Sequence, residues 1–170
     1  TDENFKIRGL NGLFLNKFSR IINETVANIK TKENQIIQFN FNVRQKIILI
    51  KLNDNLSSLD NEKNGALFYN FIKSNFIYDL TFIENNFTKN LKENESFLDE
   101  FFHGVKLKSY EFNKYKSKKD KNFFKITLSI KNQLSNFEKN KRFDSLIKGS
   151  NYTKDLVSEP GNILHPDEYA

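Results

Sequence analysis

The chain has 170 residues, of which 28% are charged and 38% hydrophobic, and its net charge is +6. This length and balance are typical of one globular domain with its own core, and no uncharged run approaches the ~20 residues that span a bilayer. Because the sequence contains no cysteine, it excludes a disulfide framework, a thiolate metal site and a cysteine nucleophile.

The N-terminal third of the chain is predicted to contain one helix followed by two strands. Apolar residues recur every three or four positions over residues 11–30, which indicates an amphipathic helix. Over residues 37–43, apolar residues alternate with Asn and Gln, which is typical of a half-buried strand. The apolar run at residues 47–50 predicts a strand buried on both faces, as in a parallel sheet.

The remainder is predicted to alternate between helices and strands. The periodicity indicates helices over residues 61–74, 95–108 and 138–157, and strands over residues 76–82 and 123–130. Strands that alternate with helices predict a three-layer α/β domain with a mixed, partly parallel sheet and helices on both faces. The helix residues expected to face the core are Leu67, Phe68, Phe71, Ile72, Leu98, Phe101, Phe102, Val105, Phe143, Leu146, Ile147 and Tyr152.

The two histidines do not form a recognisable metal or catalytic motif. His103 is expected to be structural or exposed, and His165 lies three residues before Glu168 with a proline between them and no third ligand nearby. The acidic pairs, at residues 60 and 62 and at residues 99 and 100, are expected to face water. No glycine-rich loop lies between a strand and a helix to bind phosphate. We therefore assign no catalytic, metal-binding or cofactor-binding residue.

A basic stretch from Lys106 to Lys121 supports an alternative function. Seven lysines alternate there with tyrosines and phenylalanines, a pattern in which bases could stack on the rings while the lysines contact phosphates. The competing interpretation is that the aromatic residues pack along a strand-like edge, which the lysines protect from pairing. The alternative function is therefore a basic nucleic-acid-binding module.

Both prolines of the chain lie in its last eleven residues. Pro160 and Pro166 restrict the backbone on either side of a Gly-Asn break, which predicts a rigid joint. We expect a first domain over residues 1–157, and over residues 158–170 an interdomain joint with the start of a truncated second domain. The first residues lack the basic and apolar regions of a secretory signal, so we expect a cytoplasmic location and no membrane partner.

Two motifs resemble the leucyl aminopeptidase (cytosol aminopeptidase) family. Residues 104–116 are similar to the family's glycine, leucine and Ser-Tyr-x-Phe-x-x-Tyr-Lys pattern. Residues 153–162 are similar to its Arg-Asp-Leu-x-Asn-x-Pro-x-Asn segment, with Lys154 in place of the usual Arg and Ser158 in place of the usual Asn. The stretch at residues 50–53 occupies the position of the family's Val-Gly-Leu-Gly strand end but lacks its glycines.

The resemblance implies that this chain is the N-terminal, non-catalytic domain of such an enzyme, with a macro-domain-like α/β fold. Enzymes of the family remove N-terminal residues from peptides with two divalent metals, commonly zinc or manganese, and assemble as hexamers. Their metal ligands lie in the C-terminal metallopeptidase domain, which would be the partner of this one. The resemblance therefore implies no catalytic residue and no cofactor in this fragment.

Overall fold

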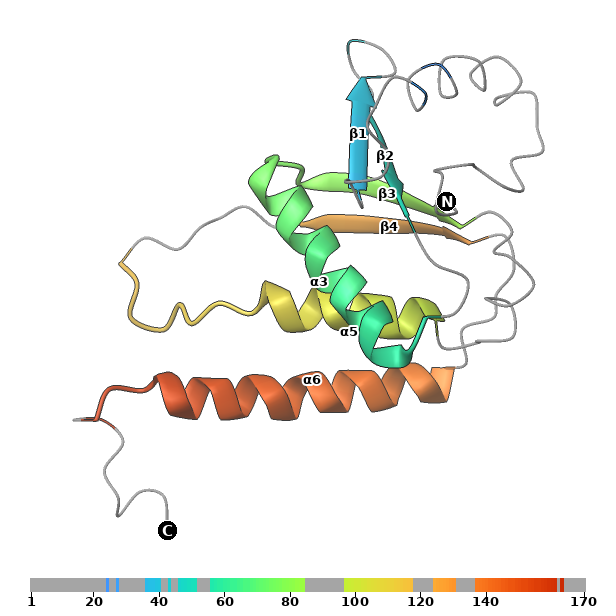
Figure 1. Cartoon of the computed structure of the whole chain (residues 1–170). Coiled ribbons are helices and arrows are strands. Elements are labelled where there is room, and N and C mark those ends of the chain that lie inside the picture. The colour runs from blue at the N-terminus through green and yellow to red at the C-terminus, as the bar shows by residue number, and fades with distance from the viewer. Residues whose placement is uncertain are drawn as a thin grey trace. The chain divides into compact units, whose positions relative to one another are not determined.

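The computed structural model describes residues 36–40, 43, 46–51, 56–84, 97–117, 124–130, 137–161 and 163, together with Glu24 and Ala27. These residues belong to two compact units, of which the first contains strands β1 to β4 and the second contains helices α3, α5 and α6 (Figure 1). The helix predicted over residues 11–30 lies outside the described residues except at Glu24 and Ala27, which are helical.

Strands β1 (Ile36–Asn40) and β2 (Lys46–Ile50) form an antiparallel pair. Five residues connect them, and so short a connection can join only antiparallel neighbours. The prediction of a β2 buried on both faces, as in a parallel sheet, is therefore wrong. The pair instead buries one cross-strand contact, between Ile37 of β1 and Leu49 of β2. The three isoleucines of β2 are half-buried, and Val43 is fully exposed.

Strands β3 (Asp79–Glu84) and β4 (Lys125–Ile130) form a parallel pair. The predicted alternation is confirmed over the residues whose side chains are described, because Leu80 is half-buried opposite Ile126 whereas Asp79 and Lys125 are exposed. The described strands therefore include one antiparallel and one parallel pair, each in a separate two-stranded sheet. This arrangement confirms an α/β fold with small sheets.

The second unit is centred on helix α5 (Phe97–Ser109), which lies between α3 (Ser58–Ser74) and α6 (Phe137–Ser158) (Figure 1). The largest fully buried apolar side chains of the unit, Phe68, Phe101 and Ile72, come from α3 and α5. The three helices appear where the sequence periodicity predicts them, with ends that differ by at most three residues. None of the described helices is long and apolar enough to cross a membrane.

The faces of the helices differ from the prediction in two places. On α3 the buried stripe includes Asn61, Asn64 and Gly65, whereas Leu67 is 45% exposed, because the buried face is set by the close approach of α5 and not by hydrophobicity alone. On α6 the predicted core residues Leu146 and Tyr152 are exposed. Among the described elements, α6 packs mainly against α5 and the segment after it, so a narrower stripe of its surface is covered.

Helix α3 ends in a Schellman motif formed without glycine. The amide of Ile77 donates to the carbonyl of Ile72 (2.9 Å) and that of Phe76 to the carbonyl of Lys73 (3.2 Å). Phe76 has a φ of 54°, in the left-handed region that usually requires glycine, and its side chain is 75% exposed. The strand predicted from residue 76 therefore begins later, at Asp79, because the motif occupies residues 75 to 77.

Candidate functional site at the junction with helix α6

The segment after α5 is attached to the C-terminal half of α6 by paired polar side chains. The hydroxyl of Tyr110 donates to Asp155 Oδ1 (2.7 Å), and both Lys114 Nζ and the Tyr115 hydroxyl donate to the carboxylate of Glu159. Tyr110 pairs with Asp155, and the later residues Lys114 and Tyr115 pair with the later Glu159. Residues 110–115 therefore run in the same direction as α6. We call this cluster, together with Lys154, the junction.

Lys154 adds a third type of contact to the junction. Its Nζ donates to the carbonyl of Leu107 in the last turn of α5 (3.0 Å) and lies 5.0 Å from the centroid of the Tyr110 ring. An ammonium group over an aromatic face is attracted by the ring's quadrupole. Lys154 is the residue that stands in place of the family's usual Arg, so the substitution retains a cation at the centre of the junction.

The contacts of Glu159 with Lys114 and Tyr115 shift the pKa of all three side chains. The hydrogen bond from Lys114, and then that from Tyr115, hold the pKa of Glu159 below its usual range, and Glu159 in turn raises the pKa of Lys114 and of Tyr115. The Glu159 side chain is only 7% exposed, whereas that of Lys114 is 59% exposed. The junction is therefore an electrostatic attachment at the surface whose strength depends on ionised carboxylates.

Helices α3 and α5 cross at a distance that only glycine permits. A Cβ atom at Gly65 would lie 1.9 Å from the carbonyl oxygen of Phe101, and one at Gly104 would lie 1.9 Å from that of Glu62. An isolated glycine within a helical pattern is a signal of close packing, so Gly65 and Gly104 could have indicated this crossing from the sequence. Gly104 is also the first residue of the motif at residues 104–116, so the motif begins at the helix crossing.

Buried polar groups accompany this crossing. Glu100 is 6% exposed and accepts hydrogen bonds from Ser58 Oγ (2.8 Å) and Asn61 Nδ2 (3.1 Å). Glu62 Oε1 lies 2.8 Å from His103 Nδ1. The expectation that these carboxylates face water is therefore wrong for Glu100 and Glu62, because tertiary partners 39 to 42 residues away in the sequence supply their hydrogen bonds.

The structural interpretation of His103 is supported by its surroundings. The residue is 7% exposed, its ring centroid lies 4.9 Å from that of Phe143 on α6, and its Nδ1 contacts Glu62. His165 and Glu168 lie outside the described residues. Among the residues that are described, no group of three His, Cys, Asp or Glu side chains is arranged to hold a metal ion.

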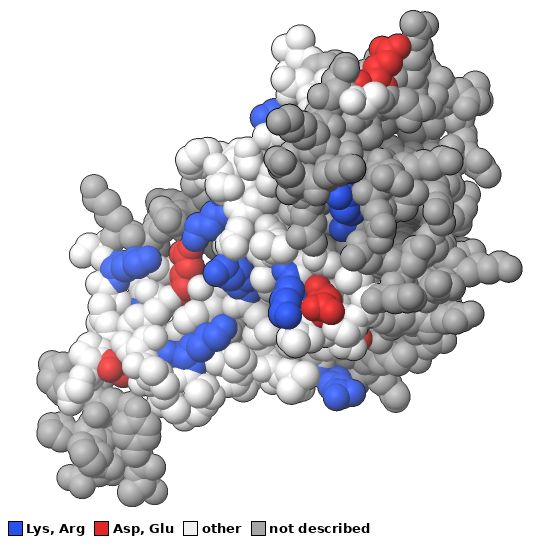
Figure 2. All heavy atoms as spheres, viewed as in Figure 1, with Lys and Arg blue, Asp and Glu red and all other residues white. Residues whose placement is uncertain are grey.

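The basic stretch at residues 106–121 is described as far as residue 117. Two of its lysines are in ion pairs, Lys106 with Asp144 of α6 (2.7 Å) and Lys114 with Glu159, the first residue after α6. The described part of the stretch contains no strand, so its aromatic residues do not form a strand-like edge. Tyr110 instead donates to Asp155 of α6 and Tyr115 to Glu159. Figure 2 shows, on the described part of one face, basic side chains that lie separately with acidic ones beside several of them.

Comparisons with known proteins point to one enzyme class. The chain is 36% identical over 84 residues to a probable cytosol aminopeptidase of Persephonella marina, a match that covers 47% of this chain and 17% of that protein. A probable cytosol aminopeptidase of Rhodopseudomonas palustris is 32% identical over 71 residues, which cover 39% of this chain and 14% of that protein. No model of a protein family matches the chain.

Among solved structures, a mutant of tomato leucine aminopeptidase has a similar fold. It superposes with a TM-score of 0.71 and 20% sequence identity, over 99% of this chain and 36% of that one. At this identity the likeness concerns the fold. The chain spans well under half the length of the solved structure and matches less than a fifth of the length of these relatives.

Proposed function

We propose that the chain is the N-terminal, non-catalytic domain of an enzyme of the leucyl aminopeptidase family. Its two motifs, its cytosol aminopeptidase relatives and its fold together support this proposal. In the longer protein, a C-terminal metallopeptidase domain with two divalent metals, zinc or manganese, would remove N-terminal residues from peptides. The finer features of the proposal are a three-layer, macro-domain-like arrangement, a cytoplasmic location and assembly as a hexamer.

The observation that carries the proposal is the contact between the two family motifs. Tyr110, Lys114 and Tyr115 belong to the first motif, and Lys154, Asp155 and Glu159 to the second, about 40 residues later. The first motif thus contacts the last turns of α6 directly before Pro160. This domain would fix the direction in which the chain leaves α6 and so orient the domain that follows.

The boundary predicted between residues 157 and 158 remains part of the proposal. Helix α6 continues without interruption past Gly149 to Ser158, and Pro160 follows two residues later. A proline cannot continue a helix because it lacks the amide donor and disfavours a helical conformation of the preceding residue. The end of α6 supports a joint at this position.

Leucine p-nitroanilide hydrolysis tests the proposal. We expect no turnover by the pure 170-residue chain at any zinc or manganese concentration, and turnover by the longer protein that contains both domains. Turnover by the short chain would contradict a non-catalytic role, and an inactive, well-folded longer protein at all metal concentrations would contradict the aminopeptidase assignment. Light scattering of the longer protein would test for the hexamer.

A variant of the longer protein tests the role of the junction. We expect Lys154→Ala to lower the temperature at which activity is lost, because the last turns of α6 lose their contacts with Leu107 and Tyr110. Lys116→Ala removes an exposed lysine from the segment after α5; it is the matched control and should leave that temperature unchanged. If both variants lost activity at the same temperature, this result would contradict a role of the junction in orienting the domains.

The nucleic-acid alternative stays a prediction, and the ion pairs of Lys106 and Lys114 with α6 argue against it because those cations are already partly neutralised. A gel shift at low salt with wild-type protein and with Lys116, Lys118 and Lys119 changed to Glu would decide it. Absence of retardation at low salt would remove the alternative.

A further inference from the structure

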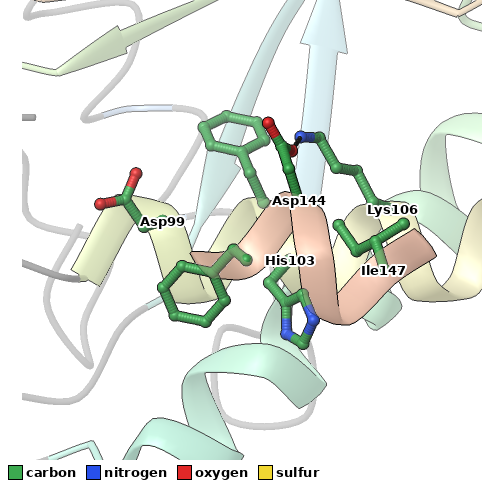
Figure 3. Close-up of a pocket in the computed structure, with 7 residues that line it drawn as sticks. Asp99, His103, Lys106, Asp144 and Ile147 are labelled. Atoms are coloured by element: carbon green, nitrogen blue, oxygen red, sulfur yellow. Dashed lines mark hydrogen bonds and ion pairs between the residues drawn. The ribbon is translucent and has the colours of Figure 1, made fainter. Parts of the chain in front are cut away.

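A small pocket lies between α5 and α6 (Figure 3). Its volume is about 240 Å³. Helix α5 contributes Asp99, Phe102, His103 and Lys106 at the spacing of one helix face, and α6 contributes Phe143, Asp144 and Ile147 in the same way. The lining of the pocket thus combines the apolar side chains of Phe102, Phe143 and Ile147 with charged groups.

The charged groups of the pocket have opposite signs and lie side by side. Lys106 Nζ and Asp144 Oδ1 are 2.7 Å apart, and Figure 3 shows this pair at the opposite side of the cluster from His103. Both side chains are slightly more than half exposed. An ion pair so accessible to water contributes little to stability and can exchange its partners readily.

The wall of the pocket also contains an unused hydrogen-bonding group. His103 is 93% buried, and its Nε2 has no hydrogen-bond partner among the described residues, while Nδ1 contacts Glu62. Buried polar nitrogen atoms nearly always have a partner, so an unpartnered one beside a cavity calls for an explanation. His103 thus adds a polar wall to the pocket, on the side opposite the ion pair of Lys106 and Asp144 (Figure 3).

We propose that the pocket binds a free amino acid with an apolar side chain of about the size of leucine. The ammonium group of such a zwitterion would pair with Asp144 and its carboxylate with Lys106, so that two ion pairs replace the one within the protein. The side chain would lie against Phe102, Phe143 and Ile147. Because opposite charges are held on one carbon of the ligand, as they are side by side in the pocket, a zwitterion fits better than a simple cation or anion.

In an aminopeptidase this ligand would be the released product, so the pocket would sense product at a site outside the catalytic domain. The role in sensing product rests on the proposed function. Binding of the amino acid does not rest on it, because binding is measured on the 170-residue chain alone. A failure of binding would leave the aminopeptidase assignment intact. A failure of that assignment would leave an amino-acid-binding domain.

Titration of the ¹⁵N-labelled chain with four compounds, followed by NMR, tests the proposal. We expect leucine to shift amide signals of α5 and α6 with millimolar affinity, a value typical of a small ligand that must offset the loss of its translational freedom. Leucinamide lacks the carboxylate, N-acetylleucine lacks the ammonium group and glycine lacks the side chain, so each should bind at least about tenfold more weakly. This series needs no variant and therefore does not depend on variant folding.

Variants locate the site. Lys106→Met and Asp144→Asn should each weaken leucine binding about tenfold or more, the loss expected when one charge-assisted contact is removed. Lys108→Met, on the same helix but outside the pocket, is the matched control and should bind as the wild type does. No shift with leucine up to about 20 mM, well above a millimolar affinity, would overturn the proposal. Equal binding of leucinamide or N-acetylleucine, or full binding by both pocket variants, would also overturn it.

Discussion

The two sides of helix α5 are held by different physical forces. Against α3 the helix packs by burial, with Phe101 1% exposed and glycines at the crossing. Toward α6 the contacts include ion pairs and hydrogen bonds of partly exposed side chains, such as Lys106–Asp144, beside the packing of the His103 ring against Phe143. The first interface depends on close packing and tolerates no added atom at its two glycines, whereas the second depends in part on charge.

The largest effect is expected at the crossing of α3 and α5. Gly104→Ala would place a methyl group 1.9 Å from the backbone oxygen of Glu62, which cannot move aside as a side chain could. We expect the free energy of unfolding to fall by about 3 kcal/mol, measured by urea denaturation followed by helical circular dichroism.

Gly149→Ala is the matched control for this change. Among the described residues, no atom beyond the neighbouring backbone of α6 lies within 4 Å of a Cβ at position 149, and the residue is inside α6. Alanine should therefore stabilise the helix by about 0.5–1 kcal/mol. A loss of stability at position 149 as large as that at position 104 would contradict the difference between the two sides of α5.

The buried polar groups beside the crossing give the next largest effect. Asn61 is fully buried, and its Nδ2 donates to the carbonyl of Phe97 (2.6 Å) and to Glu100. Asn61→Ala should lower the free energy of unfolding by about 2 kcal/mol, because two buried hydrogen bonds, to the carbonyl of Phe97 and to Glu100 Oε2, are lost. Asn70→Ala, on the exposed side of the same helix, should change it little, and a comparable loss there would contradict this account.

A stabilising change is expected at the end of α3. Phe76→Gly should raise the free energy of unfolding by about 1 kcal/mol, because glycine adopts the observed left-handed φ without the steric cost of a Cβ atom. Phe76→Ala separates this backbone effect from loss of the exposed ring, since alanine removes the ring but retains the Cβ. If alanine stabilised the protein as much as glycine does, backbone strain would not be the cause.

The smallest effect is expected at the junction and should depend on pH. Because the pKa of Glu159 is lowered in the folded protein, its contacts stabilise the fold above the usual carboxyl pKa and are lost as the pH falls through the lowered value. Glu159→Gln should therefore unfold at a lower temperature than the wild type at pH 7. The difference should disappear well below pH 4, roughly the usual pKa of glutamate, and a difference independent of pH would contradict an electrostatic junction.

The sequence predicted the elements better than it predicted their faces. Hydrophobic periodicity located α3, α5, α6 and the two later strands, because each element must bury one side at its own repeat. It did not predict the buried stripe of α3, in which asparagines face α5 while Leu67 faces water. A polar side chain can be buried when a residue distant in the sequence forms hydrogen bonds with it, and the local sequence pattern does not indicate which residue that is.

By itself, the sequence determined the α/β class, the extents of the helices and the resemblance carried by residues 104–116 and 153–162, since all of these are properties of neighbouring residues along the chain. Only the tertiary structure decided that the two motifs contact each other through Tyr110 and Asp155, that Glu62 reaches His103, and that Lys106 and Asp144 form one side of a pocket. Each of these pairs joins side chains 38 to 45 residues apart, and such partners are set by how helices pack against one another.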